Sequence, residues 1–118
     1  MLKRICAILV ILALVFASGI SYAQEAWPIT AKTYTSNTAN DLQDLTVYGI
    51  SILATSASAM GGIYDTTTLG AASNTTCRGE VGEASQYDSA ITIFPVPARI
   101  VNLTVVVSNG ALTVHYRR

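Results

Sequence analysis

Two runs of alternating apolar and polar residues near the C-terminus, Asn102–Ser108 and Ala111–Arg117, flank the dipeptide Asn109-Gly110. This arrangement is the strongest short-range signal for a β-hairpin, because a type I′ turn needs positive φ at both central residues. A two-residue loop would place three apolar cross-strand pairs on one face: Val107 with Leu112, Val105 with Val114, and Leu103 with Tyr116. The other face would carry Thr104 opposite His115. We therefore predict a hairpin with its first face in the core and its second face on the surface.

The run Leu45–Ala54 in the middle of the chain is rich in β-branched and aromatic residues. Strict alternation gives it two apolar faces, one with Tyr48, Ile50, Ile52 and Ala54, and one with Leu45, Val47, Gly49 and Leu53. Because both faces are apolar, we predict a central strand that is covered on both sides.

Weaker strand signals lie on either side of this run. Residues 29–34 alternate weakly after Pro28, a residue that fits the start of a strand. Residues 36–41 favour a turn. Residues 57–64 predict a short partner strand.

The remaining strand signals are less uniform. Residues 69–89 predict either one strand over Thr76–Val81 or a long loop, and long loops in small domains often carry function. Residues 90–94 predict a strand that ends at Pro95 and Pro97, because proline cannot donate to a ladder.

The fold class predicted from these signals is all-β. After residue 23 no ten-residue stretch has helical periodicity, so helix should be nearly absent. Six to eight strands with frequent Gly, Asn and Thr turns predict a small antiparallel β-sandwich or jelly roll. We expect a signal peptide over residues 1–23, a polar segment with a weak strand over 24–44, and the sandwich domain over 45–118.

The first 23 residues have the pattern of a cleavable secretory signal. Two basic residues precede the twelve-residue apolar run Ile5–Phe16, and small residues occupy the −3 and −1 positions before Gln24. The apolar run is shorter than the roughly 20 residues that a spanning helix needs. We predict cleavage before Gln24 and a secreted, periplasmic or cell-surface protein that is not held in the membrane afterwards. An uncleaved N-terminal anchor is the alternative.

The charge balance argues against two classes of partner. The full chain has seven Lys and Arg and seven Asp and Glu, and removal of Lys3 and Arg4 with the signal leaves a net charge of −2. A weakly acidic, charge-poor domain lacks the basic surface that binds nucleic acid or anionic lipid.

The two cysteines do not predict an internal disulfide. Cys6 lies in the predicted signal and would leave with it, so Cys77 has no partner within the mature chain. Cys77 is then either buried and inert or the site of a covalent dimer.

No residue pattern predicts catalysis, a cofactor or a metal. His115 has no nucleophile and no orienting carboxylate placed beside it by the sequence. The carboxylates form three separate groups without the spacing of an EF-hand: Asp41 with Asp44, Asp65, and Glu80 with Glu83 and Asp88. We therefore predict a protein that is not an enzyme.

Aromatic side chains are the residues that usually bind the faces of sugar rings. The Trp and Tyr residues are scattered over the mature chain, and about half lie on strand faces predicted to be core. The six residues are Trp27, Tyr34, Tyr48, Tyr64, Tyr87 and Tyr116. Trp27, close to the predicted new N-terminus, is the ring that we expect to be accessible.

Four short segments resemble a family outline. Ile63-Tyr64-Asp65, Phe94-Pro95, Leu103-Thr104-Val105 and Tyr116-Arg117 are similar to corresponding parts of small jelly-roll proteins of phage and metagenomic origin. The resemblance covers about 70 residues and implies a structural or attachment sandwich of the virion type. The predicted signal peptide departs from that outline, because a phage protein assembled in the cytoplasm needs no export, and it favours a bacterial surface role.

Two functional hypotheses from different classes follow. The first is a structural or assembly subunit of a surface layer, filament or particle, in which the polar N-terminal stretch or the sheet edges could join subunits. The second is an extracellular binding module for a glycan or a protein.

Overall fold

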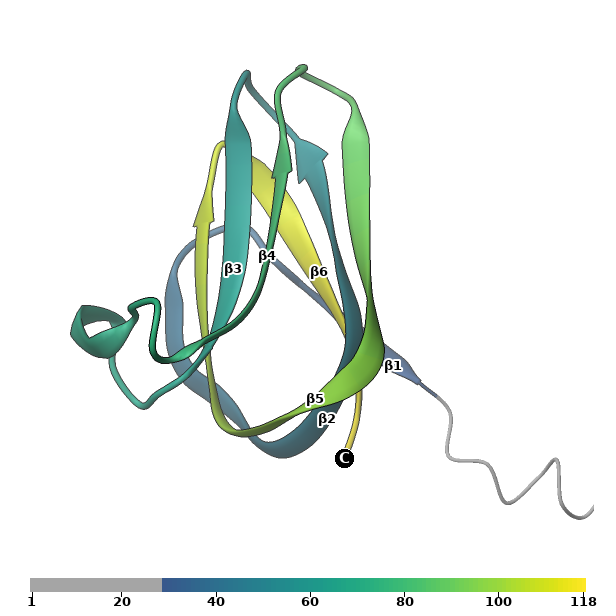
Figure 1. Cartoon of the computed structure of the whole chain (residues 1–118). Coiled ribbons are helices and arrows are strands. Elements are labelled where there is room, and N and C mark those ends of the chain that lie inside the picture. Colours follow the sequence, from purple (N-terminus) through teal and green to yellow (C-terminus); the bar gives the residue numbers. More distant parts are fainter. Residues whose placement is uncertain (1–28) are drawn as a thin grey trace, which may run out of the picture.

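The computed structural model describes residues 29–118, which form one antiparallel six-stranded sheet (Figure 1). The strands are β1 (Thr30–Tyr34), β2 (Thr38–Ala54), β3 (Ala59–Asp65), β4 (Cys77–Glu83), β5 (Ser89–Ser108) and β6 (Gly110–Arg117), in the sheet order β1-β6-β2-β5-β3-β4. The 3-10 turn η1 (Leu69–Ala71) is the one helical element within residues 29–118. The prediction of an all-β chain is confirmed, whereas the predicted signal peptide and Trp27 lie outside the described residues.

The two long strands, β2 and β5, allow the sheet to curl. β5 pairs with β2 from Ser89 to Val105, and residues 103–108 of β5 pair with β3 on the other edge of the strand. The second half of β2 pairs with β6 on its own other edge. In Figure 1 the β3–β4 side consequently lies across the core from β6. Gly61 on β3 faces Leu112 on β6, where an added Cβ would lie 2.8 Å from Leu112 Cδ1. One sheet therefore supplies both sides of its own core.

The predicted central strand contains a bulge that reverses its alternation. The pairing of β2 shifts between Val47 and Gly49 against both of its neighbours. Because the extra residue, Tyr48, changes the phase, Leu45 and Val47 before the bulge point inward, as do three residues after it. The buried set in this strand is Leu45, Val47, Ile50, Ile52 and Ala54.

The prediction that both faces of this strand are covered is therefore wrong. Leu53, on the other face, is 49% exposed. The inward face of this strand therefore takes residues from both apolar sets. The change from one set to the other occurs at the bulge.

The same bulge explains why the prolines do not end β5. Val47 pairs with Ala98 and Gly49 pairs with Ile93, so four residues of β5 (94–97) lie opposite Tyr48 without partners in the ladder. The missing N–H groups of Pro95 and Pro97 consequently cost no ladder bond, and the strand continues to Ser108.

The predicted C-terminal hairpin is wrong. β5 and β6 are not neighbours in the sheet: Val105 pairs with Ile63 on β3, and Val114 pairs with Ile50 on β2. Asn109 has a φ of 58°, but Gly110 has no positive φ, so the turn is not type I′. Gly110 instead permits close packing, since an added Cβ would lie 2.8 Å from the Leu53 carbonyl oxygen.

Asn109 connects this turn to the β2–β3 turn. Its carbonyl oxygen accepts hydrogen bonds from the backbone N–H groups of Thr55 and Ser56 at 2.9 and 3.2 Å. These bonds hold the two turns together, so that β5 and β6 leave the turn on opposite sides of the core.

Thr104 is buried rather than exposed, in contrast to the prediction. Its side chain is fully covered, and its hydroxyl donates to the Thr66 carbonyl at 2.6 Å and accepts from the Asn40 N–H at 3.1 Å. The start of β2 and the loop after β3 contact this side chain. Six apolar residues of the expected hairpin are nonetheless core residues, as predicted: Leu103, Val105, Val107, Leu112, Val114 and Tyr116.

The weaker strand signals are largely confirmed. β1, β3 and β4 lie where the alternation predicts them, and the long-loop alternative does not apply to residues 77–83. The predicted turn over 36–41 is shorter, because β2 begins at Thr38. Asn40 and Asp44 have φ values of 50° and 53°, a conformation that Asn and Asp tolerate, and this irregularity hides the start of the strand in the sequence.

Candidate functional site

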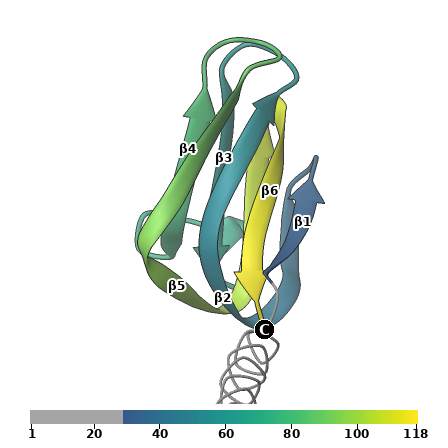
Figure 2. The same cartoon turned by 90° about the vertical axis from the view of Figure 1, so that its right-hand side faces the viewer.

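Four strand segments lie side by side in the order β1, β6, β2 and the first part of β5 (Figure 2). Their inward side chains belong to the core, and their outward side chains face away from it. We call this outward set the open face: Ala31, Thr33, Gly49, Ser51, Leu53, Ser89, Ile91, Ile93, Ala111, Thr113 and His115.

The register aligns these side chains in rows across the strands. One row runs from Thr33 through Thr113 and Ser51 to Ile91, and the hydroxyls of Thr33 and Thr113 are 2.8 Å apart. The next row ends on Ile93. Small side chains thus occupy the β1 side of the open face, and Ile91 and Ile93 occupy the β5 side. On the strands between them, His115 on β6 is level with Gly49 on β2.

The residues of the open face include no Asp, Glu, Lys or Arg, and Arg117, the next outward residue of β6, lies at its border. Hydroxyl side chains and His115 make part of the face polar, and its large apolar side chains lie on β2 and β5. Its largest side chains are well exposed: Ile91 is 64% exposed and Ile93 is 72% exposed. Ile29 and Val96, also exposed, extend the apolar surface beyond the four segments. Contiguous exposed apolar surface of this kind marks sites of interaction more often than isolated hydrophobic residues do.

The open face contains two shallow hollows. The first has a volume of about 330 Å³ and lies among residues of β2, β5 and β6 that include Ser51, Leu53 and Ala111. The second has a volume of about 210 Å³ and is lined by Ile29, Tyr48, Gly49, Ile91, Ile93 and His115. Ile91 lines both hollows, so it forms a ridge between them.

Arg117 lies beside Tyr48, one of the residues that line the second hollow. The Arg117 guanidinium lies 5.2 Å from the centroid of the Tyr48 ring, a cation–π distance, and its Nε is buried without a hydrogen-bond partner in the described part of the chain. This contact fixes the Tyr48 ring at the edge of the open face.

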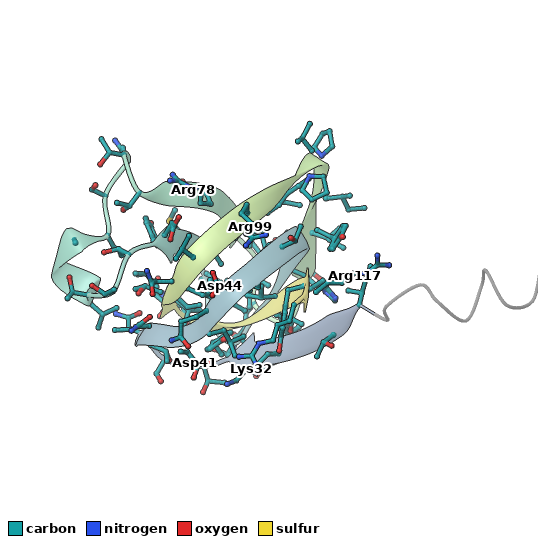
Figure 3. The ribbon with its side chains drawn as sticks, turned by 90° about the horizontal axis from the view of Figure 1, so that it is seen from below. Lys32, Asp41, Asp44, Arg78, Arg99 and Arg117 are labelled. Atoms are coloured by element: carbon teal, nitrogen blue, oxygen red, sulfur yellow. The ribbon has the colours of Figure 1, made fainter. Side chains whose placement is uncertain are left out.

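The β1 edge of the sheet carries a charge that opposes strand addition. The Lys32 ammonium pairs with the Asp41 carboxylate, which also accepts a hydrogen bond from the Tyr34 hydroxyl at 2.8 Å (Figure 3). These hydrogen bonds, first from Lys32 and then from Tyr34, lower the pKa of Asp41 below its usual value. Burial, followed by the bond to Asp41, raises the pKa of Tyr34 well above its ordinary range. Charged side chains at an edge are a common protection against pairing with another chain.

The β4 edge is covered by the molecule itself. The Thr92 hydroxyl donates to the Glu80 carbonyl at 3.4 Å, and the Phe94 ring lies so close to Gly79 that an added Cβ would be 2.4 Å from Cζ. β5 therefore lies along the free side of β4.

The carboxylates singled out in the sequence do not gather into one site. Residues 29–118 contain no group of three or more His, Cys, Asp or Glu side chains that could hold a metal ion. Asp65 accepts hydrogen bonds from the backbone N–H groups of Val101 and Asn102 at 3.2 and 3.0 Å and lies 3.9 Å from Arg78. Asp44 lies 4.0 Å from Arg99 on the surface (Figure 3). Asp65 thereby ties β3 to β5.

Cys77 is half-buried on β4, near Tyr64 and Glu80. Burial raises the pKa of the Cys77 thiol, and the Glu80 carboxylate raises it further. The Tyr64 hydroxyl lies 3.4 Å from the same carboxylate. Because the thiolate is the reactive form, these surroundings make Cys77 a poor nucleophile at neutral pH.

Sequence reasoning placed His115 on the correct outward face but missed the open face as a whole. Residues 89–93 alternate, yet the small residues Ala90 and Thr92 point inward while Ile91 and Ile93 point outward. Hydrophobicity by itself favours the opposite phase, so no signal in this segment identifies the open face.

Within residues 29–118 no helix has the length and apolar character needed to cross a membrane. Comparison of the chain with protein-family models, with curated proteins and with solved structures finds no match. The function is therefore argued from the open face.

Proposed function

We propose that this protein is an exported, non-catalytic subunit of a cell-surface or particle structure, and that it acts by burying its open face against protein. The observation that carries the proposal is the exposed Ile91 and Ile93 side chains on a face without Asp, Glu, Lys or Arg. Fully burying an isoleucine side chain contributes about 1.5–3 kcal/mol, so this face gains free energy when it is covered. Protein provides a cover that is complementary in shape as well as in polarity.

Export is the first part of the proposal. It is supported by the basic start, the twelve-residue apolar run and the small residues before Gln24. A surface or periplasmic location also fits a chain whose only cysteine after residue 23 is Cys77 and needs no disulfide partner.

The sandwich fold is the second part. The two long strands contribute to both sides of the core, and Gly61 on β3 contacts Leu112 on β6 across it. We infer from this that the curled sheet is a β-sandwich variant, the architecture shared by many extracellular structural modules.

The test follows the full chain in a bacterium with a working secretion pathway. The native mass of the exported protein in cell-surface extracts is measured for the wild type, for Ile91→Asp and for Met60→Asp. Met60 is a matched control, because it is 58% exposed on a strand that does not contribute to the open face.

We expect the wild type and Met60→Asp in a species larger than one chain, and Ile91→Asp in a smaller one. Equal native masses for all three proteins would contradict the proposal, as would retention of the wild type in the cytoplasm.

A glycan-binding module is the second candidate, because one observation favours it. The Tyr48 ring, held by Arg117, borders a hollow that also contains His115, and rings beside polar groups are suited to sugar faces. Retention of the protein on immobilised cell-wall glycan, lost in Tyr48→Ala and kept in Tyr87→Ala, would favour this function. Tyr87 is 77% exposed and does not line this hollow.

A further inference from the structure

We propose that the partner of the open face is a second copy of this chain, packed face to face about a two-fold axis parallel to the strands. The inference rests on the proposed function, since it names the protein that covers the face. Two features of the open face support it, its lack of charge and the distribution of large and small side chains, and its area sets how strong the association can be.

The lack of charge permits self-association. In a two-fold interface every residue near the axis meets its own copy or a close neighbour, so a face with one sign of charge would repel itself. The open face has no Asp, Glu, Lys or Arg, and Arg117 lies only at its border. Other charged side chains form pairs away from the face, among them Lys32–Asp41 and Arg99–Asp44 (Figure 3).

The distribution of side-chain size makes the face complementary to itself. Ile91 and Ile93 lie on the β5 side, whereas Ala31 and Thr33 lie on the β1 side. Between them, His115 on β6 is level with Gly49 on β2, so that large and small side chains also alternate there. A two-fold axis parallel to the strands, placed between β6 and β2, exchanges these two sides. In the row that contains them, Ile91 of one copy then lies over Thr33 of the other, and Ser51 lies over Thr113.

The same operation aligns the strands of the two sheets, which is the usual arrangement when sheets pack face to face at a spacing of about 10 Å.

The area predicts a weak dimer. Four strands at a spacing of about 4.8 Å and about five residues at roughly 3.3 Å each give a footprint of roughly 300 Å². Stable complexes bury about 800 Å² on each partner, so even with Ile29 and Val96 added the interface stays at the low end. Association should therefore depend on concentration and be strongest where copies are crowded together.

Sedimentation of the purified protein, produced from the full chain in a secreting host, tests association. We expect the wild type and Met60→Asp to shift from monomer to dimer as concentration rises, and Ile91→Asp to need at least a ten-fold higher concentration. A further protein carries both Ile91→Thr and Ile93→Thr, and both positions keep β-branched side chains. It should dimerise more weakly than the wild type, and its unfolding midpoint should stay close to that of the wild type.

A cross-linking experiment tests the two-fold arrangement. Thr33→Cys and Ile91→Cys, on the two outer strands of the face, are made separately in a chain without native cysteines (Cys6→Ser, Cys77→Ser), and a short bis-maleimide is added. The mixture of the two proteins should give several-fold more covalent dimer than either protein by itself, because the two-fold axis brings Thr33 over Ile91 but keeps each residue far from its own copy. Equal yields in the mixture and in Thr33→Cys by itself would overturn this geometry.

The outcomes separate this inference from the proposed function. A wild type that stays monomeric at every concentration overturns the inference. If Ile91→Asp is nevertheless absent from the larger surface species that contains the wild type, the proposed function stands, with a different protein as the partner. A dimer in solution that Ile91→Asp abolishes, together with an unchanged surface species, supports the inference and contradicts the proposed function.

Discussion

The substitutions Gly61→Ala and Leu112→Ala, made separately and together, examine whether the sheet curls over its own core. Gly61 is on β3 and Leu112 is on β6, two strands that are not neighbours in the sheet. An added Cβ at Gly61 would lie 2.8 Å from Leu112 Cδ1 and 3.3 Å from both Cδ2 and Cγ. Leu112 is fully buried, so its side chain has no free space into which it can turn.

Each single substitution should destabilise the protein for a different reason. Leu112→Ala removes buried methyl groups and leaves a cavity, a change that costs about 2–5 kcal/mol. Gly61→Ala inserts a methyl group into a filled space, which costs about 1–3 kcal/mol. The second cost is partly offset, because alanine in a strand interior is favoured over glycine by roughly 0.5–1 kcal/mol.

The double variant should cost less than the sum of the two single variants. The cavity left by Leu112→Ala accepts the new methyl group, so we expect a favourable coupling of about 1 kcal/mol or more. The measurement is the free energy of unfolding in urea, with equal slopes required for all variants.

A parallel cycle with Gly82→Ala provides the control. Gly82 lies on β4, and the nearest atom to an added Cβ is the Ala59 carbonyl oxygen at 3.5 Å. This cycle should be additive. Additivity within about 0.5 kcal/mol for the Gly61 cycle as well would mean that β3 and β6 do not meet across the core, and the curled sheet would be refuted.

Four further outcomes are expected. Thr104→Ala should cost about 1–3 kcal/mol in urea unfolding, because it removes the hydroxyl that bonds the part-buried Thr66 carbonyl and Asn40 N–H and leaves a space in the core. A cost below about 0.5 kcal/mol would argue against burial of Thr104. Gly110→Ala should cost about 1–3 kcal/mol through its contact with the Leu53 carbonyl, although no positive φ is involved; a neutral effect would contradict this close packing. Asp41→Asn should destabilise the protein at neutral pH, and the difference in unfolding free energy from the wild type should shrink as pH falls below 3.8. The reason is that the lowered pKa of Asp41 stabilises the fold only while the carboxylate is ionised, and a constant difference down to pH 2 would contradict it. Cys77 should react with iodoacetamide at pH 7 more slowly in the folded than in the urea-unfolded protein, because its pKa is raised, and equal rates would show a thiol that burial does not protect.

The amino-acid sequence was sufficient to identify the strand-forming segments and most of the core. The all-β class follows from alternation, as do β3, β4 and the burial of Leu103, Val105, Leu112 and Val114. These properties depend on neighbours in the chain and on hydrophobicity, both of which are encoded locally. The signal peptide stays a prediction, since residues 1–23 lie outside the described part.

Strand partners were decided by the tertiary structure. Asn109-Gly110 favours a turn, but a turn does not specify whether the strands on either side pair with each other or pack across the core. Here Asn109 bonds to the β2–β3 turn, and β5 and β6 each find other neighbours. Long-range pairing is determined by which arrangement buries the most apolar surface, a property of the whole chain.

The tertiary structure also determined which set of alternate residues points inward in each strand. It thereby determined which residues form the open face. A period of two shows that alternate residues share a face, but it does not show which set points inward. The bulge at Tyr48 turns Leu53 outward, and the packing of Phe94 against Gly79 turns Ile91 and Ile93 outward as well. The open face exists because the alternate residues of the same strands fill the core. Which of the two sets points inward depends on the packing of the whole sheet.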